Sequence, residues 1–271
     1  KFSFCCRWLN WGNLALSLLF AAGALYAGVK VPVVKNVHIP SERLDREYTV
    51  VVLSDLHIHR VINPLKIERI VSLANARNPD VVLLAGDIID DDVRRVSKIT
   101  ALLKGLKASK GIYFVTGNHE FYAGYDETVR ELANLGFMFL ENDGAAVGED
   151  LYLAGVPDTF AGAAYGKTPD LNRAFAKAGK GAFRLLVSHT PSDFAGRDFD
   201  LEVSGHTHGG QIFPFHIFAK LHNKYLSGLY PMPGGAEIYV SNGAGQWGPQ
   251  MRFLAPSEIT VLKLTPEKQE K

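Results

Sequence analysis

Cysteine is almost absent from this chain, and its charges nearly cancel. The two cysteines, Cys5 and Cys6, are adjacent, so they can form neither a disulfide framework nor a thiolate zinc site. The 29 Lys+Arg against 28 Asp+Glu leave a net charge of +1, so no global basic field points to nucleic acid as a partner. With 47% hydrophobic and 21% charged residues, the 271-residue chain has the composition of a globular domain with or without an appendage.

One stretch near the N-terminus lacks charge altogether. No residue from Trp8 to Val29 is charged, and this run of about 22 residues is long enough to cross a hydrocarbon core. We predict a single N-terminal membrane span that anchors the protein within residues 1–30. A cleaved signal peptide is an alternative, because Ala22-Gly23-Ala24 fits a small-x-small cleavage site, and a buried helix of the domain is another. The weak bias of the flanking charges predicts no orientation in the membrane.

The region after the apolar run differs in composition. Residues 31–47 contain Pro32, Pro40 and several charges, and we interpret them as a linker that leads away from the membrane. The functional domain would then cover residues 48–271. No pattern in the sequence indicates an oligomeric state.

Short apolar runs recur through this domain, and each is followed by a polar residue. The runs are Tyr48–Ser54, Val81–Gly86, Ile112–Gly117, Phe183–Ser188 and Leu201–Gly205, followed by Asp55, Asp87, Asn118, His189 and His206. Short runs of this kind, closed by a small residue, are typical of buried strands. In an open α/β sheet the site lies beyond the carboxyl ends of the strands, so these polar residues fall where a site is expected.

Helical periodicity separates the early runs. It covers Pro64–Arg77, Asp92–Leu106 and Thr128–Leu135. Strands that alternate with helices predict an α/β fold. Further strands are expected at Leu151–Val156, Glu237–Ser241 and Ile259–Leu264, so that the domain would contain two packed sheets with helices outside.

The polar residues at the predicted strand ends belong to a set suited to metal binding. The candidates are Asp55, His57, Asp87, Asn118, His119, His189, His206 and His208. Carboxylates and imidazoles without thiolates suit Mn, Fe or Zn. Asp55, Asp87 or Asn118 alone would be explained by turn or capping chemistry, but the joint occurrence of the whole set predicts metal ligands.

The spacing of the candidates suggests two metals. Asp55 and His57 alternate, as do His206 and His208, so on extended backbone the side chains of each pair would point the same way. The carboxylate of Asp87 can bridge two cations, since each oxygen can take one. Two metals about 3.5–4 Å apart clamp a phosphate oxygen and activate a water for hydrolysis.

Taken in order, these residues form a series of motifs. The motifs are Asp55-Leu56-His57, Gly86-Asp87, Gly117-Asn118-His119-Glu120, Ser188-His189 and Gly205-His206-Thr207-His208. Together they resemble the motif series of the calcineurin-like metallophosphoesterase family, over nearly the whole predicted domain. The stretches Gly205–Gln211 (GHTHGGQ) and Ser241–Phe253 are similar to a membrane-associated bacterial branch, and some relatives in this wider group hydrolyse the lipid A precursor UDP-2,3-diacylglucosamine.

The resemblance implies a fold, a location and a role for each residue. The fold would be a four-layer α/β/β/α sandwich, and the location would be the bacterial inner membrane. The first metal would be held by Asp55, His57, Asp87 and His208, and the second by Asp87, Asn118, His189 and His206. His119 would donate a proton to the leaving oxygen. Glu120 stands where the family often has Asp, and we expect it to support the ligands from behind.

We therefore expect a membrane-tethered, two-metal phosphohydrolase that cleaves a phosphodiester or pyrophosphate bond. Its substrate would be a phosphate ester, including a lipid-linked one such as UDP-2,3-diacylglucosamine, and nucleic acid is not expected as a partner. A phosphomonoesterase or nucleotide hydrolase is the enzymatic alternative. The non-enzymatic alternative, a catalytically silent scaffold, predicts decayed metal ligands, and none of the motifs is decayed.

Several residues near the motifs leave two interpretations open. Asp90 to Asp92 are most simply a helix N-terminus. Arg252 is interpreted as a surface residue, with a phosphate contact as the alternative, and His59 either faces the site or lies on the surface. The apolar stretch Ile212–Leu221 is either an interfacial lip for a lipid-bearing substrate or a segment packed on a sheet edge.

Overall fold

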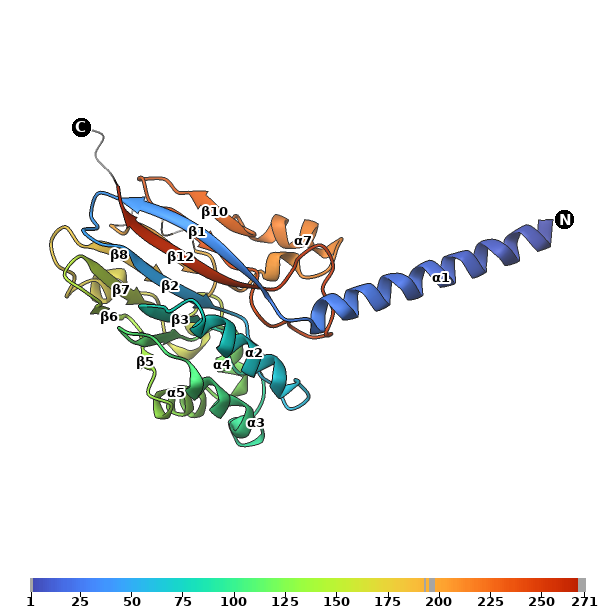
Figure 1. Ribbon diagram of the computed structural model, residues 1–271, viewed down its shortest axis with the longest axis horizontal. Helices are drawn as coiled ribbons and strands as arrows, with labels where there is room; N and C mark the ends of the chain where they lie inside the picture. Colours follow the sequence, from blue (N-terminus) through green and yellow to red (C-terminus); the bar gives the residue numbers. More distant parts are fainter. Residues whose placement is uncertain (1, 193, 195–197, 268–271) are drawn as a thin grey trace.

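The computed structural model describes residues 2–192, 194 and 198–267. Two six-stranded sheets pack face to face with helices outside them, and a long N-terminal helix projects from the domain (Figure 1). The predicted four-layer α/β/β/α sandwich is thus confirmed. The predicted strands and helices are also found, with boundaries that shift by a few residues.

The first sheet is mostly parallel, in the order β1-β12-β2-β3-β4-β5. Its strands are β1 (Val33–Ser41), β2 (Tyr48–Leu53), β3 (Val81–Ala85), β4 (Ile112–Val115), β5 (Met138–Phe139) and β12 (Glu258–Pro266). Strands β2 to β5 run parallel to one another, whereas β12 is antiparallel to β2 and parallel to β1. The carboxyl ends of β2, β3 and β4 therefore lie side by side.

The second sheet has the order β10-β11-β9-β8-β7-β6. Its strands are β6 (Asp143–Ala146), β7 (Leu151–Gly155), β8 (Phe183–Val187), β9 (Leu201–Ser204), β10 (Gly228–Pro231) and β11 (Glu237–Val240). The four central strands are parallel, and the two edge strands are antiparallel to their neighbours. The carboxyl ends of β8 and β9 therefore lie side by side.

Helices lie outside and between the strands. They are α2 (Pro64–Asn75), α3 (Val93–Thr100), α4 (Asn118–Ala123), α5 (Tyr125–Asn134), α6 (Leu171–Ala174) and α7 (Phe215–His222), with 3₁₀ turns η1 (Ala101–Gly105), η2 (Gly162–Tyr165) and η3 (His208–Gly210). Asn63 caps α2 by accepting a hydrogen bond from the Leu65 amide, and Asp92 caps α3 through the Arg94 amide. The predicted helix Asp92–Leu106 is divided in the structure into the α-helix α3 and the 3₁₀ turn η1.

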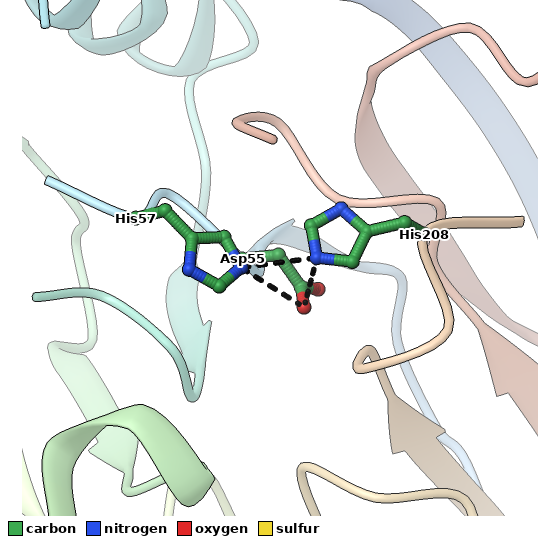
Figure 2. A group of neighbouring side chains, drawn as sticks. All are labelled: Asp55, His57 and His208. Atoms are coloured by element: carbon green, nitrogen blue, oxygen red, sulfur yellow. Dashed lines mark hydrogen bonds and ion pairs between the residues drawn. The ribbon is translucent and has the colours of Figure 1, made fainter. Parts of the chain in front are cut away.

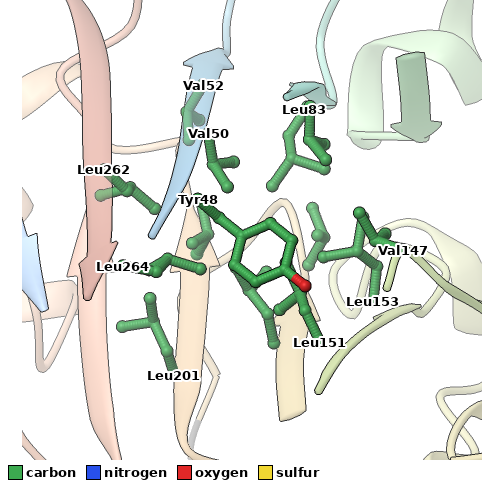
Figure 3. Close-up of a cluster of buried hydrophobic side chains, with 14 of the residues drawn as sticks. Tyr48, Val50, Val52, Leu83, Val147, Leu151, Leu153, Leu201, Leu262 and Leu264 are labelled. Atoms are coloured by element: carbon green, nitrogen blue, oxygen red, sulfur yellow. The ribbon is translucent and has the colours of Figure 1, made fainter. Parts of the chain in front are cut away.

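The apolar strands are buried on both faces. In β2, Val50 and Val52 face the cluster between the sheets (Figure 3), whereas Val51 and Leu53 belong to the cluster beneath the outer helices. The helix α2 contributes Ile67 and other residues to that outer cluster. Burial on both faces explains why the runs are continuously apolar instead of alternating.

The interpretation of residues 31–47 as a linker is wrong for most of that segment. Val33–Ser41 forms β1 and pairs in parallel with β12, from Val33 opposite Glu258 to Ser41 opposite Pro266. Because β1 is an edge strand, all of its residues except Ile39 are exposed or only partly buried, and Pro40 is tolerated there. A polar, proline-containing edge strand therefore has the composition of a linker.

The N-terminal helix α1 (Phe2–Val29) is mostly exposed from Asn10 to Val29, the part whose side chains the structure describes. Among the described residues it is the one helix long and apolar enough to cross a membrane, over Asn10–Val29, with a mean hydropathy of 1.6 and 11% of the apolar window buried. It extends away from the two sheets (Figure 1). The alternative of a buried domain helix is therefore wrong.

We predict that Leu185→Ala lowers the free energy of unfolding by about 2–5 kcal/mol, since Leu185 is fully buried in the cluster between the sheets. The measurement is urea denaturation of the detergent-solubilised full chain. Leu65→Ala is the matched control, because Leu65 is 61% exposed on α2. Equal denaturation midpoints for the two variants would contradict this assignment of the core.

Candidate metal centre

A first cluster forms where β2 and β9 end. Asp55 and His57 follow β2, and His208 lies four residues past the end of β9 (Figure 2). Asp55 Oδ1 is 3.3 Å from His208 Nε2 and 3.9 Å from His57 Nε2, and the two Nε2 atoms are 3.0 Å apart. All three residues are buried. One carboxylate oxygen and two imidazole nitrogens thus converge on one point.

A second cluster forms at the ends of β3, β4, β8 and β9. Asp87, His189 and His206 place ligand atoms within 4.8 Å of one another. Oδ2 of Asp87 lies 3.1 Å from Nε2 of His189, and Nδ1 of His206 lies 3.0 Å from Oδ1 of Asn118. The residues predicted for the second metal are therefore brought together.

The carboxylate of Asp87 lies between the two clusters. Its Oδ2 atom is 3.8 Å from Nε2 of His57 in the first cluster and 3.1 Å from Nε2 of His189 in the second. Burial raises the pKa of this carboxyl group, but the charges of His189, His57 and His119 and a hydrogen bond with His189 lower it well below its usual range. Asp87 is thus an ionised group that faces ligand atoms on both sides.

The donor atoms fit a bound cation. Nδ1 of His189 is 2.8 Å from the carbonyl oxygen of Ala85, which can only accept, so Nδ1 carries the proton. Nε2 of His189 then faces the Asp87 carboxylate at 3.1 Å. Burial lowers the pKa of His189, but the charge of Asp87 and the hydrogen bond with it raise that pKa well above its usual value, so a proton on Nε2 joins the two groups. A divalent metal can take the place of this proton, because the deprotonated nitrogen and the carboxylate are both ligands for such ions.

The backbone around these residues is strained. Asp55, His57, Asp87, His206 and His208 all have φ between 47° and 68°. This left-handed region costs a non-glycine residue roughly 1–2 kcal/mol. The expectation of extended backbone for the pairs Asp55/His57 and His206/His208 is therefore wrong. The turns are held instead by hydrogen bonds such as Asp55 N–H to Gly86 O (3.0 Å) and His57 N–H to Asp87 O (2.9 Å).

Glycines allow the clusters to pack closely. A Cβ atom on Gly117 would collide with the Asp87 carboxylate and come within 2.7 Å of the His189 ring. A Cβ atom on Gly205 would collide with the carboxylate of Asp55. The small residue before Asn118 and His206 is therefore required by the side chains of other predicted ligands.

Glu120 supports the cluster from behind, as expected. Its fully buried carboxylate accepts hydrogen bonds from the amides of Asp87 (2.9 Å), Ile88 (2.6 Å), Ile89 (3.0 Å) and Gly117 (2.6 Å). These bonds join the turn after β3 to the start of α4. Glu120 therefore fixes the backbone that carries Asp87, Asn118 and His119.

His119 lies at the rim of the clusters and is oriented by Asp90. Its Nδ1 atom is paired with the Asp90 carboxylate, which also lies 3.1 Å from Nδ1 of His57. Its Nε2 atom lies 4.0 Å from Oδ2 of Asp87. Burial lowers the pKa of His119, but the hydrogen bond to Asp90 and the charges of Asp87 and Asp90 outweigh it and raise the pKa above its usual value. Such a shift favours the protonated ring.

Two functional contacts were missed from the sequence. Asp90 was interpreted as part of a helix N-terminus, but only Asp92 caps α3. The position of Asp90 three residues after Asp87, in the same turn as a ligand, was the available signal. Arg252 was interpreted as a surface residue, but it is fully buried, with Nη1 donating to the His208 carbonyl (3.2 Å) and Nη2 lying 3.1 Å from His208 Nδ1.

A cavity of about 1090 Å³ opens over the clusters. All of the predicted site residues line it except Asp55 and His189, which lie buried beneath. Its outer wall includes Tyr122, Phe215, Phe218 and Trp247. His59 lines a neighbouring cavity instead, so it does not face the clusters. The cavity thus joins a polar, ligand-rich floor to an apolar wall.

Comparison with known proteins adds the family context. A calcineurin-like phosphoesterase family model matches residues 48–210. The chain is 37% identical to an uncharacterized metallophosphoesterase of Helicobacter pylori (strain J99), over 94% of this chain and 70% of the relative. It is 34% identical to a transmembrane protein with metallophosphoesterase domain from Danio rerio, over 93% of this chain and 61% of the relative. The crystal structure of a dimetal phosphatase from Danio rerio shares the fold, with a TM-score of 0.50 and 13% identity over 82% of this chain and 99% of that one.

We predict that Gly117→Ala weakens metal binding by about 10- to 100-fold, because the added Cβ displaces the Asp87 carboxylate and the His189 ring. The measurement is the metal content of the purified full chain by mass spectrometry, with circular dichroism as the check on folding. Gly179→Ala is the control, since a Cβ there meets nothing within 4 Å. Equal metal contents in the two folded variants would contradict the prediction.

Proposed function

The chain belongs to the calcineurin-like metallophosphoesterase family and is a metal-dependent phosphoesterase, and from this premise we propose that it is a membrane-tethered enzyme with two metals. The proposed reaction is hydrolysis of a phosphodiester or pyrophosphate bond, in a lipid-linked substrate such as UDP-2,3-diacylglucosamine. The observation that carries the proposal is the Asp87 carboxylate between two histidine-containing clusters. The apolar wall of the cavity and the candidate membrane span support the lipid-linked substrate.

The proposed ligand sets follow the two clusters. Asp55, His57, Asp87 and His208 would hold the first metal, and Asp87, Asn118, His189 and His206 would hold the second. Divalent ions there, as Mn, Fe or Zn, would supply positive charge to offset that of the phosphate oxygens and would activate a water for hydrolysis. The buried positions of Asp55 and His189 keep their ligand atoms fixed below the cavity floor.

The protein's own groups provide the proton and the orientation. Asp90 accepts from Nδ1 of His119, so in the protonated ring the second N–H, on Nε2, can donate at the cavity. The leaving oxygen of the substrate takes this proton as its bond to phosphorus breaks. Asp90 then stabilises the ring in one orientation, and the ring of Tyr122, 5.6 Å from that of His119, closes one side of the site.

The test of the substrate is release of UMP from UDP-2,3-diacylglucosamine by the full chain in detergent with Mn²⁺. We expect release that Asp87→Ala abolishes, because both clusters lose the shared carboxylate. If no UMP appears while a water-soluble aryl phosphodiester is cleaved, the lipid pyrophosphate is not the substrate and other diesters become the candidates. Cleavage of phosphomonoesters or nucleotides alone would support the alternative activity, and cleavage of none would indicate a silent scaffold.

We predict that His119→Ala lowers kcat by about 10²- to 10⁴-fold, the range for loss of a general acid, while both metals stay bound. The loss should be smaller for a nitrophenyl phosphodiester than for an alkyl phosphodiester, because nitrophenolate leaves without a proton whereas an alkoxide needs one. The measurements are kcat for the two substrates and the metal content of the purified variant. Loss of metal from this variant, or an equal loss of kcat on both substrates, would overturn the assigned role.

A further inference from the structure

Helix α7 exposes nearly all of its apolar side chains. Phe215, Ile217, Phe218 and Leu221 are between 49% and 77% exposed, and no residue of this helix is buried. The alternative in which the stretch packs on a sheet edge is therefore wrong for α7. A contiguous apolar surface of this kind marks contact with another apolar phase or partner.

The helix has two apolar faces with different surroundings. Phe215, Phe218 and Ala219 line the cavity above the metal clusters. Ile217 and Leu221 lie one turn apart, so they share another face, and neither lines that cavity. The helix thus separates the cavity from whatever covers its outer face.

The segment before α7 is tied to a loop that contacts the candidate membrane span. The Phe213 amide donates to the carbonyl of Phe253 (3.1 Å), and the Phe253 amide donates to the carbonyl of Gln211 (2.9 Å). The ring of Phe253 packs edge-on against Phe20 of α1, with ring centroids 4.5 Å apart. Both α1 and α7 therefore lie at the same end of the domain (Figure 1).

Further contacts hold α1 in this position. The Arg252 amide donates to the carbonyl of Ala24 (2.9 Å), and the buried Nζ of Lys66 donates to the carbonyl of Gly28 (2.9 Å). Ala24 is fully buried against the domain. The last part of the helix is thus attached to the domain by both hydrogen bonds and packing.

The position along α1 at which Phe253 makes its contact places the loop that contains Phe253 at the bilayer. Phe20 lies nine residues before the end of α1, about 13 Å along the helix axis. The interfacial zone of one leaflet is only about 5–8 Å thick, so Phe253 reaches the apolar region if α1 spans the membrane. Leu254, next to it, is 76% exposed. The loop and the adjoining α7 therefore come to the membrane surface.

The charge of the segment also fits a lipid surface. Residues 209–236 contain no aspartate or glutamate, and Lys220 lies exposed on α7. Apolar side chains combined with basic residues are typical of helices that lie in the plane of an anionic membrane surface.

We propose that α7 is a second membrane contact, which lies in the lipid surface with Ile217 and Leu221 inserted among the acyl chains. Phe215 and Phe218, on the inner face, line the route from the bilayer to the metal clusters. A phosphate-bearing amphiphile then reaches the site by lateral movement and without leaving the membrane. This inference rests on the proposed function for the tether and for the substrate.

The first test reports on membrane contact without turnover. The full chain carrying Leu221→Cys, with Cys5→Ser and Cys6→Ser, is labelled with an environment-sensitive fluorophore and reconstituted in phosphatidylcholine–phosphatidylglycerol vesicles isolated by flotation. We expect a blue shift and quenching by nitroxide-bearing lipids. The control chain carries the label on Met138→Cys instead, in the same Cys5→Ser, Cys6→Ser background. Met138 is 40% exposed on β5, at the end of the domain remote from α1 (Figure 1).

A label at position 221 that behaves like the label at position 138 would overturn the proposal. Protein that fails to float would overturn it together with the tether. Because this readout does not depend on catalysis, it decides the role of α7 even if the proposed activity fails.

The second test separates substrate access from chemistry. We expect the double variant Ile217→Asp, Leu221→Asp to cleave a long-chain phosphodiester in the bilayer about tenfold more slowly, while a water-soluble aryl phosphodiester is cleaved within about twofold of the unmodified rate. Met138→Asp is the matched control and should change neither rate. Equal effects on both substrates, or no effect on either, would overturn the proposed route. Failure of the unmodified protein to cleave either substrate would count against the proposed function and leave the fluorescence result to decide the role of α7.

Discussion

The burial of one ionised carboxylate, that of Asp87, between two sets of imidazoles is the constraint on which the rest of the site depends. This carboxylate follows β3 at the centre of the first sheet, and it has to face His57 on one side and His189 on the other. An ionised group at this depth is stable only when positive charge or hydrogen-bond donors surround it. The neighbouring structure supplies that environment from several segments of the chain.

Each of these segments departs from ordinary local preference. The turns that carry the clusters adopt left-handed backbone at five non-glycine residues, and Glu120 is buried to accept the amides of the turn after β3. Arg252 is buried to hold the strand-end loops through the carbonyls of His208, Asn242 and Gly245. Each of these features alone costs free energy of folding. They persist because the two packed sheets bury continuous apolar strands on both faces and fix the ends of those strands.

The same loop connects the site with the N-terminal helix. The Arg252 amide bonds to Ala24 of α1, while its side chain contacts His208 in the first cluster. The next residue, Phe253, joins α1 to the segment that precedes α7. A single short segment therefore sets the position of the candidate span, the apolar wall of the cavity and one histidine of the site. The mouth of the site is thereby placed at the end of the domain from which α1 extends.

The sequence by itself determined the fold class, the strands and helices, the apolar N-terminal segment and the eight candidate residues. It could do so because parallel strands end at a common edge, so residues that follow them gather there whatever lies between. Other features were decided only by the tertiary structure, including the left-handed turns, the pairing of Asp90 with His119, the burial of Arg252 and the place of β1 as an edge strand. These depend on contacts between distant segments, as between His57 and His208, which are separated by 151 positions. Local sequence does not predict such contacts. The burial and hydrogen bonding of a residue depend on the distant segment that packs against it and not on its neighbours along the chain.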